Sequence, residues 1–251
     1  MAFRMQLSFQ LWKLETKMEK LKVPGDAKRS RFVFVVIRFL AKLLTRTEVI
    51  DYDKIPQSGA FLLTTNHISR LDTPFLMFSS PRKDVVGIVA SNYQDKKLIG
   101  PLMKGLGAIW MDREQWDFKA FREAVHYLNE GWVVGIAPEG TRSKQQQMLP
   151  GKPGAVLLAQ RARVPIVPVG IWGTPYLLQN LLHFKRNHIT IRYGRAYHLP
   201  EMGEMDHKEW LEKCTAEIMC RIAVLLPESY RGVYAEHPRL RELLDQNKTA
   251  I

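Results

Sequence analysis

The 251-residue sequence has only two cysteines, Cys214 and Cys220, and no long uninterrupted hydrophobic run. The cysteines lie six positions apart in a segment with a helical pattern, so they face different directions and form neither a disulfide framework nor a zinc site. The longest apolar run, residues 32–44, includes Arg38 and Lys42 and is too short and too charged for a membrane span. These absences predict a globular protein of a reducing compartment.

The sequence also lacks internal repeats, biased tracts and recognisable nucleic-acid-binding modules. No secretory pattern is expected in the first 22 residues, because apolar residues are interleaved with charges and no small-residue cleavage site follows. With 46% hydrophobic and 25% charged residues, the composition is unlike that of disordered or collagen-like chains. The length fits one large domain or two small ones with a real core.

Acidic residues are too few to balance the basic ones, since 25 Asp and Glu face 37 Lys and Arg, a net charge of +12. This excess predicts an anionic partner, which from composition alone is nucleic acid, an anionic membrane surface or a phosphorylated small molecule. Residues 1–46 carry a net +8 of this charge. The basic character therefore belongs mostly to the N-terminal fifth of the chain.

Residues 1–46 are predicted to form two helices. Apolar side chains recur at three- and four-residue spacing over residues 3–21, and Pro24-Gly25-Asp26 then breaks the chain. The second helix is very apolar with a narrow basic stripe. The pattern predicts an N-terminal two-helix motif that lies in a membrane interface, with its basic side chains near anionic head groups. Two helices packed on the domain, with solvated lysines, are the alternative.

From residue 47 onward, short apolar runs alternate with helical patterns. This predicts an α/β domain over residues 47–226, with a mixed central sheet flanked by helices, and a C-terminal tail over 227–251 with a short helix. The candidate strands are 60–64, 85–90, 133–137, 166–171 and 189–193, and the candidate helices are 73–79, 96–106, 116–130, 154–161 and 207–225. Ligands of such domains usually bind where strands end, which directs attention to the residues that follow them.

The first such place is Asn66-His67-Ile68-Ser69-Arg70-Leu71-Asp72, which follows an apolar strand and precedes Thr73-Pro74. On a continuous helix His67 and Asp72 would lie roughly 140° apart, so they can meet only if the junction curls back. An Asp on one imidazole nitrogen makes the other a general base for a hydroxyl. The alternative is that Asp72 caps the helix or pairs with Ser69 in a capping box, while His67 is an ordinary loop residue.

The second place is Ala137-Pro138-Glu139-Gly140-Thr141-Arg142-Ser143, after the strand 133–137. It offers a glycine, a hydroxyl, a carboxylate and an arginine whose planar fork suits phosphate oxygens. Between the two places, the apolar stretch 107–113 ends in Arg113. The alternative is a polar turn with a surface arginine, and a salt-bridged structural role for Arg113.

Together and in this order, the motifs resemble the glycerolipid acyltransferase family, specifically its 1-acyl-glycerol-3-phosphate (lysophosphatidic acid) acyltransferases. Four blocks carry the resemblance, which runs from about residue 47 to about residue 200: Asn66-His67 with Asp72, residues 107–113, residues 138–143 and residues 164–169.

The resemblance implies an enzyme that moves a fatty acyl group from an acyl thioester, carried by coenzyme A or acyl carrier protein, to the free hydroxyl of 1-acyl-glycerol-3-phosphate. The product would be phosphatidic acid, a phospholipid precursor. No cofactor and no metal are expected, because a thioester is already activated and a base with a positioned alcohol can suffice. Nucleic acid is not an expected partner. The implied location is the cytoplasmic face of the cell membrane, as a peripheral or monotopic protein.

Carried over by position, His67 is implied as the general base and Asp72 as the residue that orients it. Arg142 and Arg113 are implied on the phosphate, and Lys104 and Lys152 are further candidates for positive potential there. The implied substrate-binding residues are Arg113, Glu139, Gly140, Thr141 and Arg142.

Other functions remain open from the sequence alone. The same chemistry could act on glycerol 3-phosphate, another lysophospholipid or a lipidated amino acid. A non-catalytic lipid-binding relative is a second class, against which the presence of both His67 and Asp72 argues. A basic nucleic-acid-binding protein is a third, and it would show salt-sensitive binding that depends on residues 1–46.

Removal of the N-terminal motif should release the protein from membranes. We expect the full chain to co-sediment with anionic liposomes and the truncated chain to remain in the supernatant, because both the apolar faces and most of the excess charge are lost. Binding to neutral liposomes is the control that shows how much of the binding depends on electrostatic attraction to anionic head groups. Unchanged binding of the truncated chain to anionic liposomes would reject this use of the motif.

Overall fold

The computed structural model describes residues 39, 43–80, 82–97, 99–105, 107–113, 117–175, 177–183 and 185–249. Apart from positions 39 and 43–46, the predicted N-terminal two-helix motif lies outside the described residues. Within these ranges, no helix is both long enough and apolar enough to span a bilayer.

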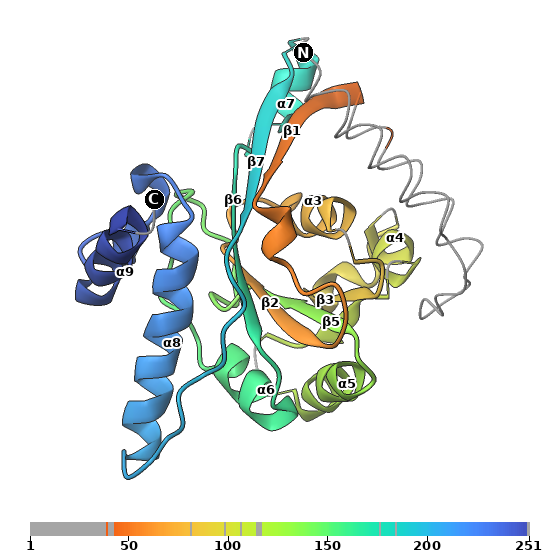
Figure 1. The fold of residues 1–251 in the computed structure, drawn as a ribbon. Coiled ribbons are helices and arrows are strands. Elements are labelled where there is room, and N and C mark those ends of the chain that lie inside the picture. The colour runs from red at the N-terminus through yellow and green to blue at the C-terminus, as the bar shows by residue number, and fades with distance from the viewer. Residues whose placement is uncertain are drawn as a thin grey trace.

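A seven-stranded sheet in the order β1-β7-β6-β2-β5-β3-β4 forms the centre of the fold (Figure 1). Neighbouring strands are parallel except for β6 and β7, which are antiparallel. The prediction of a mixed sheet is thus confirmed. The strands are β1 (Thr45–Ile50), β2 (Phe61–Thr65), β3 (Val85–Ala90), β4 (Ile109–Met111), β5 (Val133–Ile136), β6 (Ile166–Trp172) and β7 (Asn187–Tyr193).

Five of these strands coincide with the apolar runs of the sequence, whereas β1 and β4 do not. β1 lies at one edge of the sheet and exposes three consecutive residues, so its sequence shows no buried run. β4 has only three residues at the other edge. β1 begins at Thr45, so a truncation that removes residues 1–44 spares this strand.

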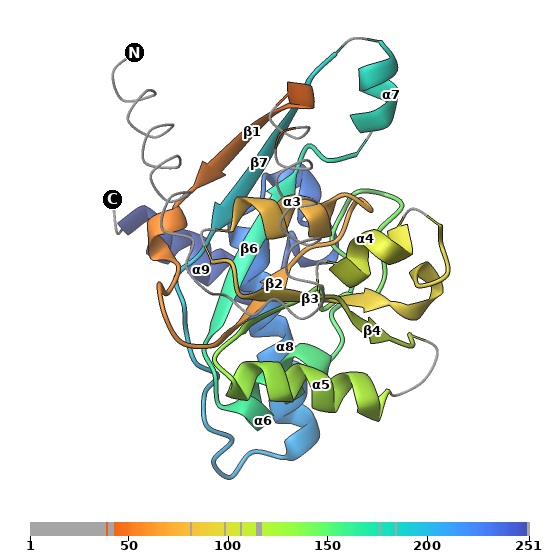
Figure 2. The ribbon, with the colours of Figure 1, turned by 90° about the vertical axis from the view of Figure 1, so that its right-hand side faces the viewer.

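Helices cover both faces of the sheet (Figures 1 and 2). Side chains alternate between faces along each strand, so Phe61 and Leu63 of β2 pack in the core beneath α3, while Leu62 packs in the core beneath α5, α6 and α8. α4 lies beside α3. The helices are α3 (Asp72–Ser79), α4 (Ile99–Gly105), α5 (Phe118–Asn129), α6 (Gly154–Ala162), α7 (Leu177–Leu182), α8 (His207–Val224) and α9 (Pro238–Thr249).

The two cysteines are buried side chains of α8 with free thiols. Burial raises the pKa of Cys214 to about 11 and that of Cys220 to about 12, so both stay protonated near neutral pH. They pack in the core beneath α8 and form no disulfide with each other, as the sequence predicts.

The segment after α8 packs against the loop 148–151. The amide of Met148 donates to the carbonyl of Tyr230 at 2.9 Å, and the amide of Gly151 donates to Tyr234 Oη at 2.9 Å. Arg239 of α9 binds the carboxylate of Glu217 on α8. The predicted C-terminal tail is therefore docked on the domain, and its helix α9 has 12 residues.

Gly232 should be essential for this docking. Its φ is +52°, and a Cβ would lie 2.2 Å from the carbonyl oxygen of Met148. Gly203 has a similar φ of +56°, but no atom lies within 4 Å of a Cβ there. Gly203→Ala therefore measures only the cost of placing alanine at a positive φ. We expect Gly203→Ala to lower the free energy of unfolding by about 1–2 kcal/mol and Gly232→Ala by at least ~1 kcal/mol more. Urea unfolding followed by circular dichroism measures both, and equal losses would show that the close approach to Met148 is unimportant.

Candidate active site

Three loops meet at the carboxyl end of the central strand of the sheet. β2 lies between β5 and β6 and is parallel to both, so the segments that follow these three strands emerge side by side. They carry the motif that begins at Asn66, the motif 137–143 and the residues after Trp172. The site is thus assembled at the place where ligands of α/β domains usually bind.

His67 and Asp72 come together because the chain curls back before α3 begins. His67 Nδ1 lies 3.1 Å from Asp72 Oδ2, and the same oxygen accepts hydrogen bonds of 2.7 Å from the amides of both Ile68 and Ser69. Pro74 occupies the first turn of α3, where it costs no helical hydrogen bond. Asp72 therefore faces the imidazole and also binds the amide of Ser69, as the acidic member of a capping box would. It does not cap α3 itself, because the N-cap residue is Leu71 and no side chain bonds there.

The second oxygen of Asp72 has a different partner. Thr174 Oγ1 donates to Asp72 Oδ1 at 2.5 Å, and both side chains are 1% exposed. Asp72 thus accepts hydrogen bonds from two backbone amides and one hydroxyl besides facing His67. These donors replace the hydrogen bonds that water would supply to an exposed carboxylate.

Asn66 fixes the point at which the loop leaves β2. Its side chain is fully buried and forms two hydrogen bonds to Ile171 of β6: Nδ2 donates to the carbonyl at 2.8 Å, and Oδ1 accepts from the amide at 2.9 Å. The amide side chain therefore extends the contact between β2 and β6. This arrangement sets the direction in which His67 leaves the sheet.

The carboxylate of Glu139 holds the backbone of the histidine loop. Its Oε1 accepts from the amide of His67 and its Oε2 from the amide of Leu149, both at 2.9 Å. The amide of Ser143 also donates to the carbonyl of His67 at 2.8 Å. Glu139 is 1% exposed, and burial raises its pKa to about 7, although the two amide hydrogen bonds lower it. The loop after β5 thus binds both the backbone amide and the backbone carbonyl of His67.

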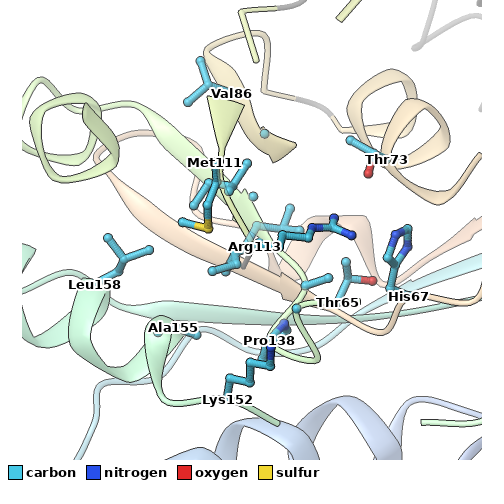
Figure 3. Close-up of a pocket in the computed structure, with 18 of the residues that line it drawn as sticks. Thr65, His67, Thr73, Val86, Met111, Arg113, Pro138, Lys152, Ala155 and Leu158 are labelled. Atoms are coloured by element: carbon cyan, nitrogen blue, oxygen red, sulfur yellow. The ribbon is translucent and has the colours of Figure 1, made fainter. Parts of the chain in front are cut away.

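His67 borders a cavity of about 440 Å³ (Figure 3). In Figure 3 the guanidinium of Arg113 points toward His67, while Leu158 and Ala155 lie at the opposite end. Most of the lining is apolar and comes from both sides of the sheet, including Leu63, Leu76, Met77, Val85, Val86, Ile88, Met111, Phe121, Ile136 and Leu158. The site therefore combines a histidine, a cation and a long apolar wall.

Comparison with known proteins shows the family of the chain. The family model described as Acyltransferase matches residues 46–172, just over half of the chain. The chain belongs to the acyltransferase family. The match begins within β1 and ends at the last residue of β6, so it includes His67, Arg113 and Glu139.

Similar acyltransferases come from bacteria and animals. One is the 1-acyl-sn-glycerol-3-phosphate acyltransferase of Bacillus subtilis, which is 26% identical over 195 residues that cover 78% of this chain and 96% of the relative. Another is 1-acyl-sn-glycerol-3-phosphate acyltransferase beta of Homo sapiens, 31% identical over 157 residues that cover 60% of this chain and 52% of the relative. The chain thus spans nearly all of the bacterial relative and about half of the human one.

A solved structure supports the fold. The crystal structure of the 1-acyl-sn-glycerophosphate (LPA) acyltransferase PlsC from Thermotoga maritima superimposes with a TM-score of 0.59 and 21% sequence identity. The likeness covers 85% of this chain and 86% of that one. The mixed sheet flanked by helices is therefore the architecture of a known acyltransferase.

Only some of the residues that the resemblance assigns to acceptor binding line the cavity. Arg113 and Gly140 line the cavity, whereas Glu139, Thr141 and Arg142 do not. Both carboxylate oxygens of Glu139 are taken up by backbone amides, so its visible contacts are with the histidine loop and the loop 148–151. Burial lowers the pKa of Arg113, opposed by Tyr93, but an arginine remains charged at neutral pH.

Of the two lysines considered from the sequence, Lys152 lines the cavity and Lys104 does not. The side chain of Lys152 lies over Gly140: a Cβ there would be 3.0 Å from Lys152 Cδ and 3.3 Å from Nζ. Gly140 also has a φ of +67°, which favours glycine. The glycine therefore leaves room for a second cation beside the cavity.

Sequence reasoning missed Thr174 altogether. A signal was available, since Thr174 lies two residues after a buried strand, whereas the predicted site residues follow other strands. No group of three or more His, Cys, Asp or Glu side chains within the described ranges could hold a metal ion.

The buried carboxyl of Glu139 should make the acyltransferase less stable as pH rises. The pKa of Glu139 is about 7 in the folded protein, and its ordinary value is 4.5. Between pH 4.5 and about pH 7, Glu139 therefore binds more protons in the folded than in the unfolded chain. The free energy of unfolding therefore falls as pH rises through this window. Between about pH 5 and about pH 8, we expect wild type to lose roughly 2–3 kcal/mol more than Glu139→Gln, whose amide does not titrate.

Urea unfolding of both proteins at the two pH values measures this difference, because all other titrating groups are shared. A constant difference in the free energy of unfolding would mean that the carboxyl of Glu139 titrates alike in the folded and unfolded chains.

Proposed function

We propose that this acyltransferase moves a fatty acyl group from an acyl thioester to the free hydroxyl of 1-acyl-glycerol-3-phosphate, giving phosphatidic acid. The observation that carries the proposal is the imidazole of His67, held by Asp72 at 3.1 Å, at the border of an apolar cavity that also contains Arg113. The names of the Bacillus and human relatives support this acceptor.

His67 is suited to act as a general base. Its Nδ1 faces the carboxylate of Asp72, which fixes the tautomer with a proton on Nδ1 and leaves Nε2 to accept a proton. With Nε2 in reach of the acceptor hydroxyl, the imidazole removes the proton as the hydroxyl oxygen attacks. Asp72 then stabilises the imidazolium that forms.

The reaction needs no enzyme nucleophile. The hydroxyl oxygen attacks the thioester carbonyl carbon, a tetrahedral intermediate forms, and the carbon–sulfur bond breaks as the carbonyl is restored. The departing thiolate takes up the proton that His67 removed from the hydroxyl, so the products are an ester and a free thiol. Because the thioester is already activated, the protein has to supply a base and correct positioning. No cofactor or metal enters this scheme.

Arg113 and Lys152 are suited to bind the acceptor phosphate. Both border the same cavity as His67, and the guanidinium of Arg113 points toward His67 (Figure 3). A guanidinium pairs with phosphate oxygens through two parallel hydrogen bonds, and an ammonium adds a point charge. The phosphate would thereby hold the acceptor with its hydroxyl near His67.

The apolar wall of the cavity is suited to a fatty acyl chain. Residues from β3, α5 and α6 extend it away from the polar end, toward Leu158. Burial of each methylene there is worth about 0.8 kcal/mol, which favours long-chain substrates. We propose acyl-coenzyme A or acyl carrier protein as the carrier of the thioester.

We also propose that the protein works at an anionic membrane surface, on the cytoplasmic face of the cell membrane, as a peripheral or monotopic protein. Its acceptor is a membrane lipid, and the N-terminal 46 residues carry most of the excess positive charge. Phe39 and Leu43 are 64% and 54% exposed, as expected of side chains that meet lipid rather than the domain.

An acceptor panel tests this function. Purified protein is given an acyl thioester with 1-acyl-glycerol-3-phosphate, glycerol 3-phosphate, other lysophospholipids and a lipidated amino acid in turn, and free thiol is measured. We expect preference for 1-acyl-glycerol-3-phosphate and a loss of about 10²–10⁴-fold in kcat for His67→Ala, the usual contribution of a general base. Preference for an acceptor without phosphate, or full activity of His67→Ala, would contradict the proposal.

The same panel tests the phosphate site. Arg113→Met should raise KM for the phosphorylated acceptor by about 10–100-fold, because charge-assisted hydrogen bonds are lost. Arg122→Met, which removes an exposed arginine of α5 that does not line the cavity, is the matched control for net charge. Equal KM values for the two variants would reject the role of Arg113.

A further inference from the structure

Thr174 is a buried hydroxyl at the catalytic dyad that lies two residues beyond the family match. It follows β6, which lies next to β2, the strand that precedes His67. Its Oγ1 donates to Asp72 Oδ1 at 2.5 Å. A charge-assisted hydrogen bond between two side chains that are each 1% exposed is strong, because no water competes for either atom.

The two oxygens of Asp72 are held by different parts of the chain. Oδ2 accepts from the amides of Ile68 and Ser69 and faces His67 Nδ1, all within the loop before α3. Oδ1 accepts from Thr174, its one hydrogen-bond donor within the described part of the chain. Thr174 therefore fixes the rotation of the carboxylate, and with it the direction of the oxygen that faces the imidazole.

Thr174 is itself held by the residues on either side of it. The side-chain amide of Asn187, at the start of β7, donates to the carbonyls of Gly173 at 2.9 Å and Pro175 at 3.0 Å. Asn187 Oδ1 in turn accepts from Asn180 of α7 at 2.7 Å. The threonine thus sits in a turn that one buried side chain fastens to the neighbouring strand.

Close packing reinforces this turn. Gly173 has a φ of +83°, and a Cβ there would lie 2.0 Å from the carbonyl oxygen of His188 on β7. The chain therefore reaches Thr174 along a path that only glycine permits. A turn this constrained can hold a hydroxyl at a fixed place.

We propose that Thr174 is a positioning residue of the catalytic dyad, which orients Asp72 and so sets both the direction and the basicity of His67. This inference rests on the proposed function in that it takes His67 as the general base. Without the hydroxyl, more of the negative charge of Asp72 is left to stabilise the protonated imidazole. The carboxylate also becomes free to rotate away from the angle at which it directs the ring.

Thr174→Val tests the inference, since it keeps the shape of the side chain and removes the donor. Nuclear magnetic resonance of protein labelled at histidine follows the titration of His67, whose signal is identified by its loss in His67→Ala. We expect the titration midpoint of His67 in Thr174→Val to lie roughly half to one pH unit above that of wild type. Thr174→Ser, which restores a donor, should return the midpoint toward wild type.

Two further variants separate positioning from a general effect on the fold. Thr215→Val is the matched control, because Thr215 is also buried but donates to the carbonyl of Leu211 on α8; its midpoint should equal that of wild type. Asn187→Ala loosens the turn without removing the hydroxyl and should shift the midpoint in the same direction as Thr174→Val. The midpoint in Asn187→Ala also tests the inference if Thr174→Val fails to fold.

Acyl transfer provides a second readout. The acid limb of kcat/KM against pH should move to higher pH in Thr174→Val, and kcat should fall by about tenfold with KM for the acceptor within about twofold. The other charged groups that border the cavity or hold the histidine loop are Asp112, Arg113, Asp117, Glu139 and Lys152, and all of them are the same in both proteins.

The two ideas fail separately. If wild type turns over no thioester with any acceptor, the proposed function falls, while the midpoint of His67 still decides the role of Thr174. If wild type is active and Thr174→Val shares its midpoint and acid limb, Thr174 is not a positioning residue. A shift of equal size in Thr215→Val would overturn the inference too, because it would show that the loss of any buried hydroxyl moves the titration.

Discussion

The arrangement of the site depends on one buried carboxylate, that of Asp72. At 1% exposure this group cannot be solvated by water, so the chain must surround it with hydrogen-bond donors. The donors come from two places far apart in the sequence: the amides before α3 and the hydroxyl of Thr174 after β6. Satisfying the carboxylate thus fixes two loops relative to each other, and the imidazole of His67 takes its position from that junction.

A second buried carboxylate, Glu139, links the histidine to the C-terminal segment. It bridges the amides of His67 and Leu149, and the loop 148–151 is in turn bound by Tyr230 and Tyr234. The two carboxylates differ in their effect. Asp72 faces the ring of His67 and influences its chemistry, whereas Glu139 holds only the backbone of that residue. Packing of the tail therefore bears on the site through the backbone of the loop 148–151 and of His67.

The distribution of charge agrees with a protein that acts on a phosphorylated lipid. Most of the net +12 belongs to the first 46 residues, and the domain itself places two cations, Arg113 and Lys152, beside the cavity. Most of the other side chains that line the cavity are apolar. A cavity polar at one end and apolar along its length suits an amphiphile whose head is anionic and whose chain is buried.

The sequence by itself determined the α/β class, the five strands with buried runs and the pairing of His67 with Asp72 as a candidate dyad, because hydrophobic periodicity and motif spacing are local properties. It could not reveal β1 or β4, since edge strands this exposed or this short carry no such pattern. Only the tertiary structure decided that Arg113 and Gly140 line the cavity while Glu139 faces backbone amides, and that Thr174 donates a hydrogen bond to Asp72. The reason is physical: a side chain's partners are set by which strands lie side by side, and Thr174 meets Asp72 across 102 residues of chain because β6 pairs with β2.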